Sequence, residues 1–458
     1  MNVRSPQTFA PPGQHIVIVG GGATGALAAL HLLNRDDRCR VTVIEPAHPL
    51  GAGIAYSTPD PDHILNTRAR NMSAYPDDPH HFLRWLKGRP ETRGTSGESF
   101  VSRQVFGRYL HDLLAPFLSA RPQRLRVVQA SCLALTGNGE RVVARLDDGQ
   151  SVLADAAILA TGPGRRPPDP QGLLLSAWDC PKPKTPDGRV IIIGSGLSMV
   201  DQVHSLLNRG HTGEILVVSR RGLLPRPHAP GTPLQINPAD IPLGAPLSAL
   251  LGLTRSLVRE AERRGGTWRD AVDGLRPHVQ RLWVDMGMVE RARFLRHAVV
   301  WWDVHRHRLP PFSEARLGAA ARRGQLTYLR GCFQSISPGD QAGEVRVRIL
   351  LPLQNEISDL SAELVIDCRG TRTDPAQDPS PLVTDLLSRG MARPDTLAIG
   401  LDVSRDGALV DAGGVPSSRI FVAGPAARAA FWEITAIPDI REQAHVLAAR
   451  LAGTMQVV

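Results

Sequence analysis

Short apolar runs alternate with Ala- and Leu-rich segments in the N-terminal part of the chain. Residues 15–19 and 41–45 are rich in Val and Ile, which predicts two buried strands, and the segment 26–34 between them predicts a helix. The same strand–turn–helix–strand pattern returns over residues 189–219. A β-α-β unit of about 30 residues is the core of a dinucleotide-binding domain. Two such units therefore predict two domains of that kind.

The rest of the pattern indicates how the two units are joined. A short strand is predicted at 156–158, and a Pro-rich linker follows at 165–186. The segment 247–297 has few Pro or Gly residues and a helical period, strands return from 345, and a last helix is predicted over 437–452.

We therefore expect an α/β chain with two nested Rossmann-like dinucleotide-binding domains. The first comprises residues 14–165 and is completed by residues 345–458. The second comprises residues 186–344 and carries a helical insertion near 245–300.

The turn of the first unit has the pattern G-x-G-x-x-G, formed by Gly20, Gly22 and Gly25 between the predicted strand and helix. Gly20 permits a sharp turn, Gly22 lets backbone N–H groups approach a pyrophosphate, and Gly25 lets the helix pack closely on the strand. The following strand ends in Glu45, which is placed to accept hydrogen bonds from an adenosine ribose. In this context the motif predicts a dinucleotide site.

The turn of the second unit matches the pattern less well. Gly194, Gly196 and Ser198 lie between a predicted strand and helix, but Met199 replaces the third glycine. The flanking strand and helix still favour a second dinucleotide site.

The strand that follows the second turn ends in Ser219, Arg220 and Arg221 rather than in an acid. Two guanidinium groups suit a 2′-phosphate, so we expect NADPH, with NADH as the alternative if the arginines face solvent.

Composition excludes several other classes of protein. Apolar residues make up 42% and charged residues 21% of the 458 residues, which argues against disorder and coiled coil. The net charge of +9 comes from scattered Arg without a basic run, so we expect no nucleic-acid partner. No apolar run is long enough to span a membrane, and the five Cys residues show no metal or disulfide spacing, so we expect a cytoplasmic protein without a metal site.

Several segments together carry a resemblance to a known family. Leu159-Ala160-Thr161-Gly162 resembles the short motif that closes the flavin domain in two-dinucleotide flavoproteins. More narrowly, the chain resembles the family of FAD-dependent urate hydroxylases and flavin-dependent amino-acid N-monooxygenases, in the segments 51–58, 63–67, 72–79, 106–110, 301–308 and 431–436.

The resemblance implies that the first unit binds FAD and the second binds the nicotinamide cofactor. Thr161, Gly162 and Gly424 are then expected to contact FAD. Many relatives place an acid after the last glycine, where it binds the ribityl chain, but here Pro425 follows Gly424. Only the close approach of Gly424 is therefore carried over.

Three residues are candidate catalytic groups. Asn66 is expected near the isoalloxazine ring, Arg306 is expected to anchor an anionic substrate, and Trp432 precedes the final helix. A loop held by side-chain caps, a network of Asp–Arg pairs and simple packing are the respective structural alternatives. His305 and His307 also suggest a metal, but no third ligand has a recognisable spacing.

The resemblance implies an FAD-dependent, NAD(P)H-consuming monooxygenase that uses molecular oxygen to hydroxylate a small polar substrate. Urate leads among the substrates because an electrophilic oxygen donor needs an electron-rich target, and N-hydroxylation of an amino acid such as aspartate is the runner-up. A flavin reductase or dehydrogenase without oxygen insertion, or a non-catalytic redox sensor, remain as alternatives.

Overall fold

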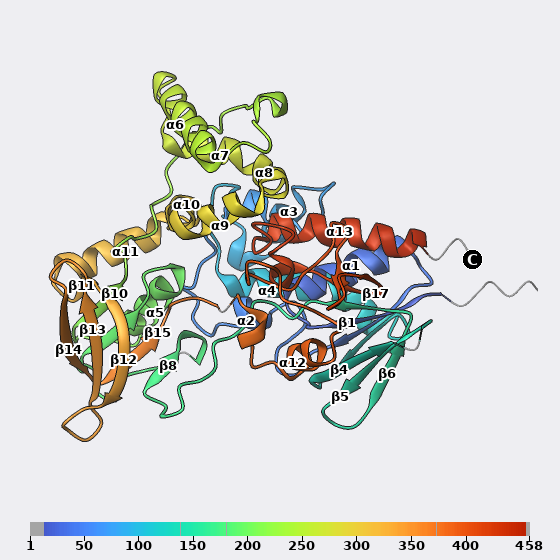
Figure 1. The fold of residues 1–458 in the computed structure, drawn as a ribbon, viewed down its shortest axis with the longest axis horizontal. Helices are drawn as coiled ribbons and strands as arrows, with labels where there is room; N and C mark the ends of the chain where they lie inside the picture. The colour runs from blue at the N-terminus through green and yellow to red at the C-terminus, as the bar shows by residue number, and fades with distance from the viewer. Residues whose placement is uncertain (1–12, 138, 180, 372, 455–458) are drawn as a thin grey trace, which may run out of the picture.

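The first sheet of the computed structural model is built around the N-terminal β-α-β unit (Figure 1). The model describes residues 13–137, 139–179, 181–371 and 373–454. The strand order of this first sheet is β16-β17-β7-β1-β2-β3. All neighbouring strands in it are parallel except β16 and β17, which are antiparallel. The strands are β1 (His15–Val19), β2 (Arg40–Ile44), β3 (Leu125–Val128), β7 (Ala156–Leu159), β16 (Ala408–Val410) and β17 (Pro416–Val422).

Both faces of this sheet are covered, as a parallel sheet requires. Ile16 and Ile18 of β1 pack against one layer of helices, whereas Val17 and Val19 point to the opposite face. The helices are α1 (Ala23–Arg35), α4 (Arg103–Ser119) and α13 (Ile437–Thr454). The opposite face is covered by α12 (Pro381–Ser388) and by an antiparallel sheet of β4 (Cys132–Gly137), β5 (Val142–Leu146) and β6 (Ser151–Ala154).

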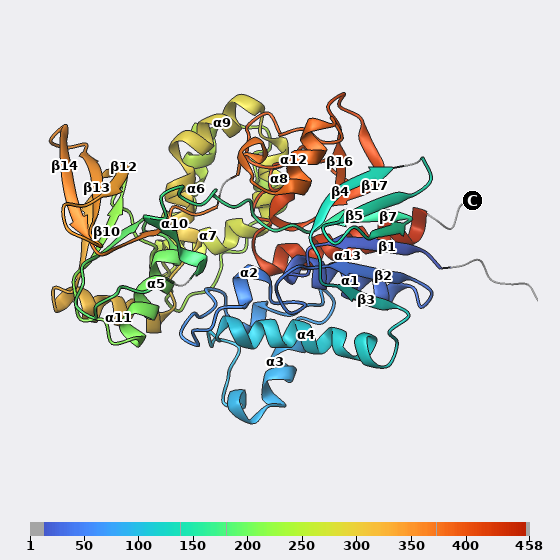
Figure 2. The same cartoon turned by 90° about the horizontal axis from the view of Figure 1, so that it is seen from below.

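The second sheet lies at the other end of the molecule (Figure 2) and has the order β11-β10-β9-β15-β8. Its strands are β8 (Leu174–Ser176), β9 (Val190–Ile193), β10 (Ile215–Ser219), β11 (Leu326–Arg330) and β15 (Leu364–Asp367). One face packs on α5 (Leu197–Asn208) and α11 (Pro311–Arg322). The other packs on an antiparallel sheet of β12 (Cys332–Pro338), β13 (Val345–Leu351) and β14 (Glu356–Ala362).

This topology corrects the predicted boundary at residue 345. Strand β15 pairs with β9 in the second sheet, and β13 and β14 continue the sheet that begins with β12. Residues 345–367 therefore belong with the second unit, because their hydrogen-bond partners lie there. The chain returns to the first sheet only with β16 and β17.

A group of helices separates β10 from β11 in the sequence. It consists of α6 (Leu247–Arg263), α7 (Trp268–Leu275), α8 (Val279–Asp285), α9 (Met288–His297) and α10 (Val299–Arg306). Figure 1 shows α6 and α7 projecting from the body of the molecule above α8 and α10. Thr267 and Asp270 form a reciprocal capping box at the start of α7, which fixes where that helix begins. Short helices α2 (Gly53–Tyr56) and α3 (His81–Lys87) complete the first unit.

No helix in the described part of the chain is both long and apolar enough to cross a bilayer.

Candidate active site

The first glycine turn is shaped to receive an anion at the N-terminus of α1. Gly20 has φ +106°, and a Cβ there would lie 2.3 Å from the carbonyl oxygen of Ala160. A Cβ on Gly25 would lie 1.9 Å from the carbonyl oxygen of Gly20, so only glycine fits. At Gly22 the nearest atom is the Cα of Gly53 at 3.5 Å, and no side chain caps the helix. The first N–H groups of α1 therefore have no side-chain partner at the cap, and the turn has room for a close backbone approach, which fits a dinucleotide pyrophosphate.

Glu45 holds this turn from the end of β2. Its Oε2 accepts a hydrogen bond of 2.8 Å from the Gly21 N–H, and its Oε1 accepts bonds of 3.1 Å from the N–H groups of Ala47 and His48. The Glu45 carboxylate, which is predicted to bind a ribose, thus also holds the backbone of the glycine turn at Gly21 and the backbone that follows β2 at Ala47 and His48. Its contact with a ribose remains a prediction.

The second turn repeats this geometry at the N-terminus of α5. Gly194 has φ +112°, and a Cβ there would lie 2.3 Å from the carbonyl oxygen of Cys368, which follows β15. Nothing lies within 4 Å of a Cβ on Gly196, and α5 begins there without a side-chain cap. The hydroxyl of Ser195 donates to the Leu223 carbonyl at 2.6 Å and so holds the turn. Met199, which replaces the third glycine of the motif, does not block the turn. The space at the start of α5 lies at Gly196, where a Cβ would meet no atom within 4 Å.

A cavity of about 810 Å³ extends from the second turn toward the first sheet. One face of α10 forms part of its wall. The cavity brings together the residues predicted to contact the nicotinamide cofactor, namely Gly194, Gly196, Ser198, Ser219, Arg220 and Arg221. Arg221 also donates to the Arg296 carbonyl at 3.2 Å, so its side chain is held at the cavity.

A smaller cavity of about 50 Å³ is lined by Thr161 and Gly162, the residues predicted to contact FAD after β7. Both cavities are lined by Thr371, Arg428 and Thr435. The two cavities therefore share these three residues.

Gly424 lies just after the last strand of the first sheet, β17, and next to Pro425, which lines the smaller cavity. Gly424 has φ +70°, and a Cβ would lie 2.4 Å from the Thr24 hydroxyl oxygen, on the first turn of α1. Its N–H donates to Gln443 Oε1 at 2.7 Å, which ties the end of β17 to α13. The close approach inferred for Gly424 is thus made to α1, and a contact with FAD remains a prediction.

Arg306 is paired inside the protein. Its Nε lies 2.9 Å from Glu433 Oε2, and the two side chains are 12% and 6% exposed. The indole N–H of Trp302 donates to Glu433 Oε1 at 2.6 Å. Burial opposes ionisation of Glu433, but Arg306 and its neighbours keep the pKa of this carboxyl below its ordinary value. This pairing argues against Arg306 as the anchor of an anionic substrate.

Trp432 packs in the interior. Only 2% of it is exposed, and its ring stacks on Trp283 with 4.5 Å between centroids. The Arg428 guanidinium lies 4.4 Å from its ring centroid. These contacts support the packing alternative for Trp432 rather than a catalytic role.

Asn66 lies on a segment that docks against the second unit. Its carbonyl oxygen accepts a hydrogen bond of 2.9 Å from His228 Nε2, and Arg68 donates to the Ala229 carbonyl at 3.0 Å. Burial lowers the pKa of His228 to about 4, so its ring is neutral at pH 7. No hydrogen bond among the described residues joins Asn66 to Arg306 or Trp432. Arg306 thus lies against Glu433, the neighbour of Trp432 in the chain, whereas the hydrogen bond of Asn66 is made to His228.

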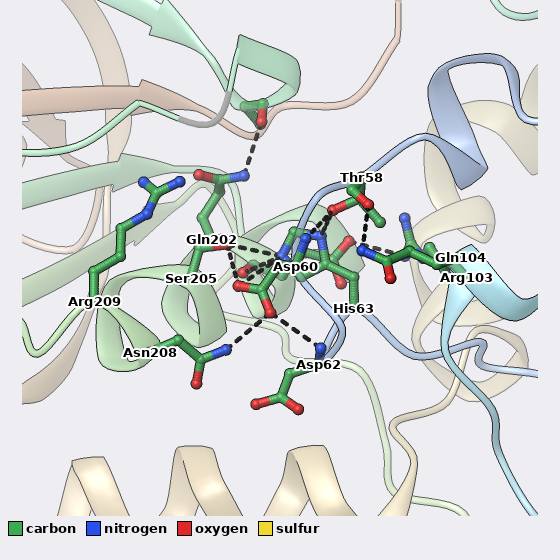
Figure 3. A network of polar contacts seen from close by, with 12 residues as sticks. Thr58, Asp60, Asp62, His63, Arg103, Gln104, Gln202, Ser205, Asn208 and Arg209 are labelled. Carbon is green, nitrogen blue, oxygen red and sulfur yellow. Dashed lines mark hydrogen bonds and ion pairs between the residues drawn. The ribbon is translucent and has the colours of Figure 1, made fainter. Parts of the chain in front are cut away.

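A buried polar network fixes the two units against each other (Figure 3). His63 Nε2 lies 2.9 Å from the Ser205 hydroxyl, which donates to Asp60 Oδ2 at 2.9 Å. Arg103 of α4 pairs with Asp201 of α5 at 2.8 Å. Burial opposes ionisation of Asp60, but hydrogen bonds to its carboxylate outweigh this and lower its pKa. The side chains around His63 thus hold α5 at a set position relative to the first unit.

Two charged residues of these cavities were not among the predicted catalytic groups. Arg428 is half-buried, lines both cavities, and makes no ion pair within 4.0 Å among the residues described here. Asp303 lines the larger cavity, and burial raises its pKa to about 6. Asp303 lies in the 301–308 segment that carried the resemblance, whereas no motif pointed to Arg428.

His305 and His307 face different spaces, which argues against a shared metal. His307 lines the 810 Å³ cavity, and burial lowers its pKa to about 4. The Nδ1 of His305 donates to the Trp301 carbonyl at 2.7 Å on another face of α10. No group of three or more potential metal ligands occurs among the residues that the structure describes.

Comparisons with known proteins agree with this geometry. Residues 17–164 match the family model described as FAD-NAD(P)-binding. Over 251 residues the chain is 26% identical to the uncharacterized protein YdhS of Escherichia coli K12, and the match covers 46% of each chain, less than half of that relative's length.

Two solved structures have the same fold over nearly the whole chain. The reduced ornithine hydroxylase PvdA of Pseudomonas aeruginosa is 15% identical, with a TM-score of 0.65 over 96% of this chain and 99% of its own. The ornithine N-hydroxylase KtzI of Kutzneria sp. 744 is 14% identical, with a TM-score of 0.66 over 97% of this chain and 100% of its own. Residues 17–164 thus match an FAD-NAD(P)-binding domain, in a chain that has the same fold as these two ornithine hydroxylases.

Proposed function

We propose that the protein is an FAD-dependent monooxygenase that consumes NADPH, or NADH, and molecular oxygen to hydroxylate the amine nitrogen of a small amino acid. The observation that carries the proposal is the pair of helix N-termini at Gly22 and Gly196 that lack a side-chain cap, together with two cavities, one lined by Gly196 and one by Thr161, that share Arg428 and Thr435. Bound FAD supplies the chemistry that takes a hydride from the nicotinamide and activates oxygen.

The chain contributes binding and orientation in this proposal. The N–H groups of α1 and α5 hold the two pyrophosphates, and Arg220 and Arg221 hold a 2′-phosphate. The network around His63 keeps the two units in one orientation, so that the two cofactors meet at a fixed distance.

The charges of Arg428 and Asp303 favour an amino acid over urate. Arg428 suits a substrate carboxylate, and Asp303, which is mostly ionised at pH 7 with a pKa of about 6, suits an ammonium group. A zwitterion offers a partner to both groups, whereas the urate anion offers one to Arg428 alone. Urate remains the second candidate because Arg428 suits any planar anion.

The test is NADPH oxidation by the FAD-loaded protein with L-ornithine, L-aspartate or urate in turn, measured together with hydroxylated product and hydrogen peroxide. One amino acid should stimulate oxidation and yield a hydroxylamine with little peroxide. Consumption of urate with both amino acids inert would overturn the assignment. Flavin reduction without any product would instead favour a reductase.

Arg428→Gln tests the proposed role of Arg428 as the anchor of the substrate carboxylate. The matched control is Arg405→Gln, a change at an exposed arginine of the same C-terminal part. Loss of a charge-assisted hydrogen bond costs about 1.5–3 kcal/mol, so the first change should raise KM for the substrate about ten- to hundredfold. The second should leave KM unchanged. Equal effects of both changes would contradict the assignment of Arg428.

A further inference from the structure

A second large cavity, of about 550 Å³, lies among the helices between β10 and β11. Helices α6, α7, α8, α9 and α10 surround it, and Figure 1 shows α6 and α7 above α8 and α10. Its wall is mainly Leu, Val and Trp. The tryptophans are Trp268, Trp283, Trp301, Trp302 and Trp432.

Helix α10 separates this cavity from the nicotinamide-side cavity. Trp301, Trp302 and His305 line the apolar cavity, together with Ala298 just before the helix. The residues Val300, Asp303, Val304 and His307 line the other one. Each set follows the spacing of one helix face. The apolar cavity is therefore distinct from both dinucleotide regions.

The tryptophan rings present apolar surface to this space. The indole N–H of Trp302 donates to Glu433, and that of Trp283 donates to the Ala429 carbonyl at 2.8 Å. Their polar atoms are thus satisfied elsewhere. The Trp283 ring is buried and already stacks on Trp432, so the half-buried Trp302 and the exposed Trp301 offer the ring surface for a planar ligand.

Among the described residues on the wall, Arg255 is the side chain with a fixed charge, and the other polar side chains are Thr or His. These side chains are Thr254, Arg255, His297 and His305, and no Asp or Glu of the described residues lines the cavity. An amine would find no carboxylate here, whereas an anionic group would find Arg255.

The size of the cavity favours a small molecule over a peptide. A sphere of 550 Å³ is about 10 Å across, no wider than one α-helix with its side chains, and ligand pockets of about 300–1,000 Å³ are typical. Leu251 and Trp301 line it while 39% and 49% exposed, so they provide apolar surface where it opens to solvent.

We propose that this cavity binds an aromatic small molecule of two or three rings that carries one anionic group. The rings pack between the tryptophans, and the anionic group lies toward Arg255. The site is separate from the sites of FAD, the nicotinamide cofactor and the proposed amino-acid substrate, and it lies one helix away from Asp303.

Three probes with one ring system test this assignment: 1-naphthylacetate, 1-naphthylacetamide and 1-naphthylmethylamine, which are anionic, neutral and cationic. Each is titrated by calorimetry into the full chain saturated with FAD and NADP⁺. We expect one binding site, with the acetate bound most tightly and the amine at least about tenfold more weakly. Equal affinity for all three, or no binding of the acetate at millimolar concentration, would overturn the proposal.

Two substitutions on α6 form a matched pair. Thr254 lines the cavity, whereas Ser256 is exposed on another face of the same helix. Thr254→Trp should fill the space and weaken acetate binding at least about tenfold, and Ser256→Trp should leave it within about twofold. Equal affinities of the two variants, or competition by NADP⁺, would place the probe elsewhere and refute the site.

A third variant tests the charge of the site without filling the cavity. Arg255→Gln should remove the preference for acetate over acetamide while leaving acetamide binding unchanged. A retained preference would refute the role of Arg255. Flavin reduction by NADPH serves as a separate readout, because the proposed monooxygenase activity can fail while this binding site stands.

Discussion

Alanine at Gly22 and at Gly25 should separate cofactor binding from folding. Gly22 has φ −67° and ψ −169°, which alanine adopts without strain, and its Cβ would lie 3.5 Å from the nearest atom, Gly53 Cα. A Cβ on Gly25 would lie 1.9 Å from the Gly20 carbonyl oxygen, so the helix or the turn has to move. The same methyl group thus makes an ordinary contact at one position and collides with backbone at the other.

The magnitudes follow from these distances. Alanine is a poorer N-cap than glycine, so Gly22→Ala should lower the free energy of unfolding by no more than about 1 kcal/mol. Its methyl group occupies the space expected for the pyrophosphate. Loss of one or two charge-assisted hydrogen bonds should weaken FAD binding about a hundredfold, or about 2.7 kcal/mol. Gly25→Ala should cost about 1–3 kcal/mol of stability through overpacking, reduced by up to about 1 kcal/mol of helix propensity, and should also impair FAD binding.

The assay is titration of FAD into flavin-free protein, followed by quenching of flavin fluorescence, with urea unfolding of the same samples. We expect Gly22→Ala to lose FAD affinity with a loss of unfolding free energy of no more than about 1 kcal/mol, and Gly25→Ala to lose both affinity and stability. Gly22→Ala with affinity within about threefold of the unsubstituted protein would refute the pyrophosphate site at this turn.

Three further predictions concern the charged groups. Arg220→Ala or Arg221→Ala should raise KM for NADPH about ten- to hundredfold and leave KM for NADH unchanged in steady-state assays. Glu433→Gln should lower the free energy of unfolding by about 3–5 kcal/mol, because it leaves Arg306 buried without a counterion. Since the folded-state pKa of Glu433 is lowered, its stabilisation is present above the ordinary Glu pKa and should be lost in acid unfolding as pH falls through the folded-state pKa. Asp303 has a pKa raised to about 6, so kcat/KM for an amine substrate should fall as pH drops through about 6, and Asp303→Asn should abolish that limb of the pH profile.

The sequence predicted the local parts of the fold well because they depend on neighbouring residues. The strand, glycine turn and helix at the N-terminus occur as β1, Gly20 and α1, close to the expected bounds. The second unit was found from the same pattern even without its third glycine, since Gly194 and Gly196 alone shape the turn and leave it open.

The partner of a strand was harder to predict, because hydrogen-bonding partners lie far apart in the chain. Strand β15 was assigned to the first sheet but pairs with β9, 174 positions apart at Leu364 and Val190. One sequence signal was available. Gly162 and Gly370 each follow their strand, β7 or β15, with the same spacing, and both have positive φ. The residue after each strand, Ala160 or Cys368, meets the first glycine of a dinucleotide turn.

Three arginines lie near the proposed substrate site, and their ion pairs decide which of them is available to a substrate anion. Arg306 lies 2.9 Å from Glu433, and Arg276 lies 2.7 Å from Asp439. If either arginine bound a substrate anion, it would leave a carboxylate unpaired in a largely buried position, at a cost of several kcal/mol. Arg428 has no carboxylate within 4.0 Å among the described residues, and it lines both cavities. A substrate carboxylate at Arg428 would break no ion pair among the described residues, and for that reason we propose Arg428 rather than Arg306 as the anchor of an anionic group.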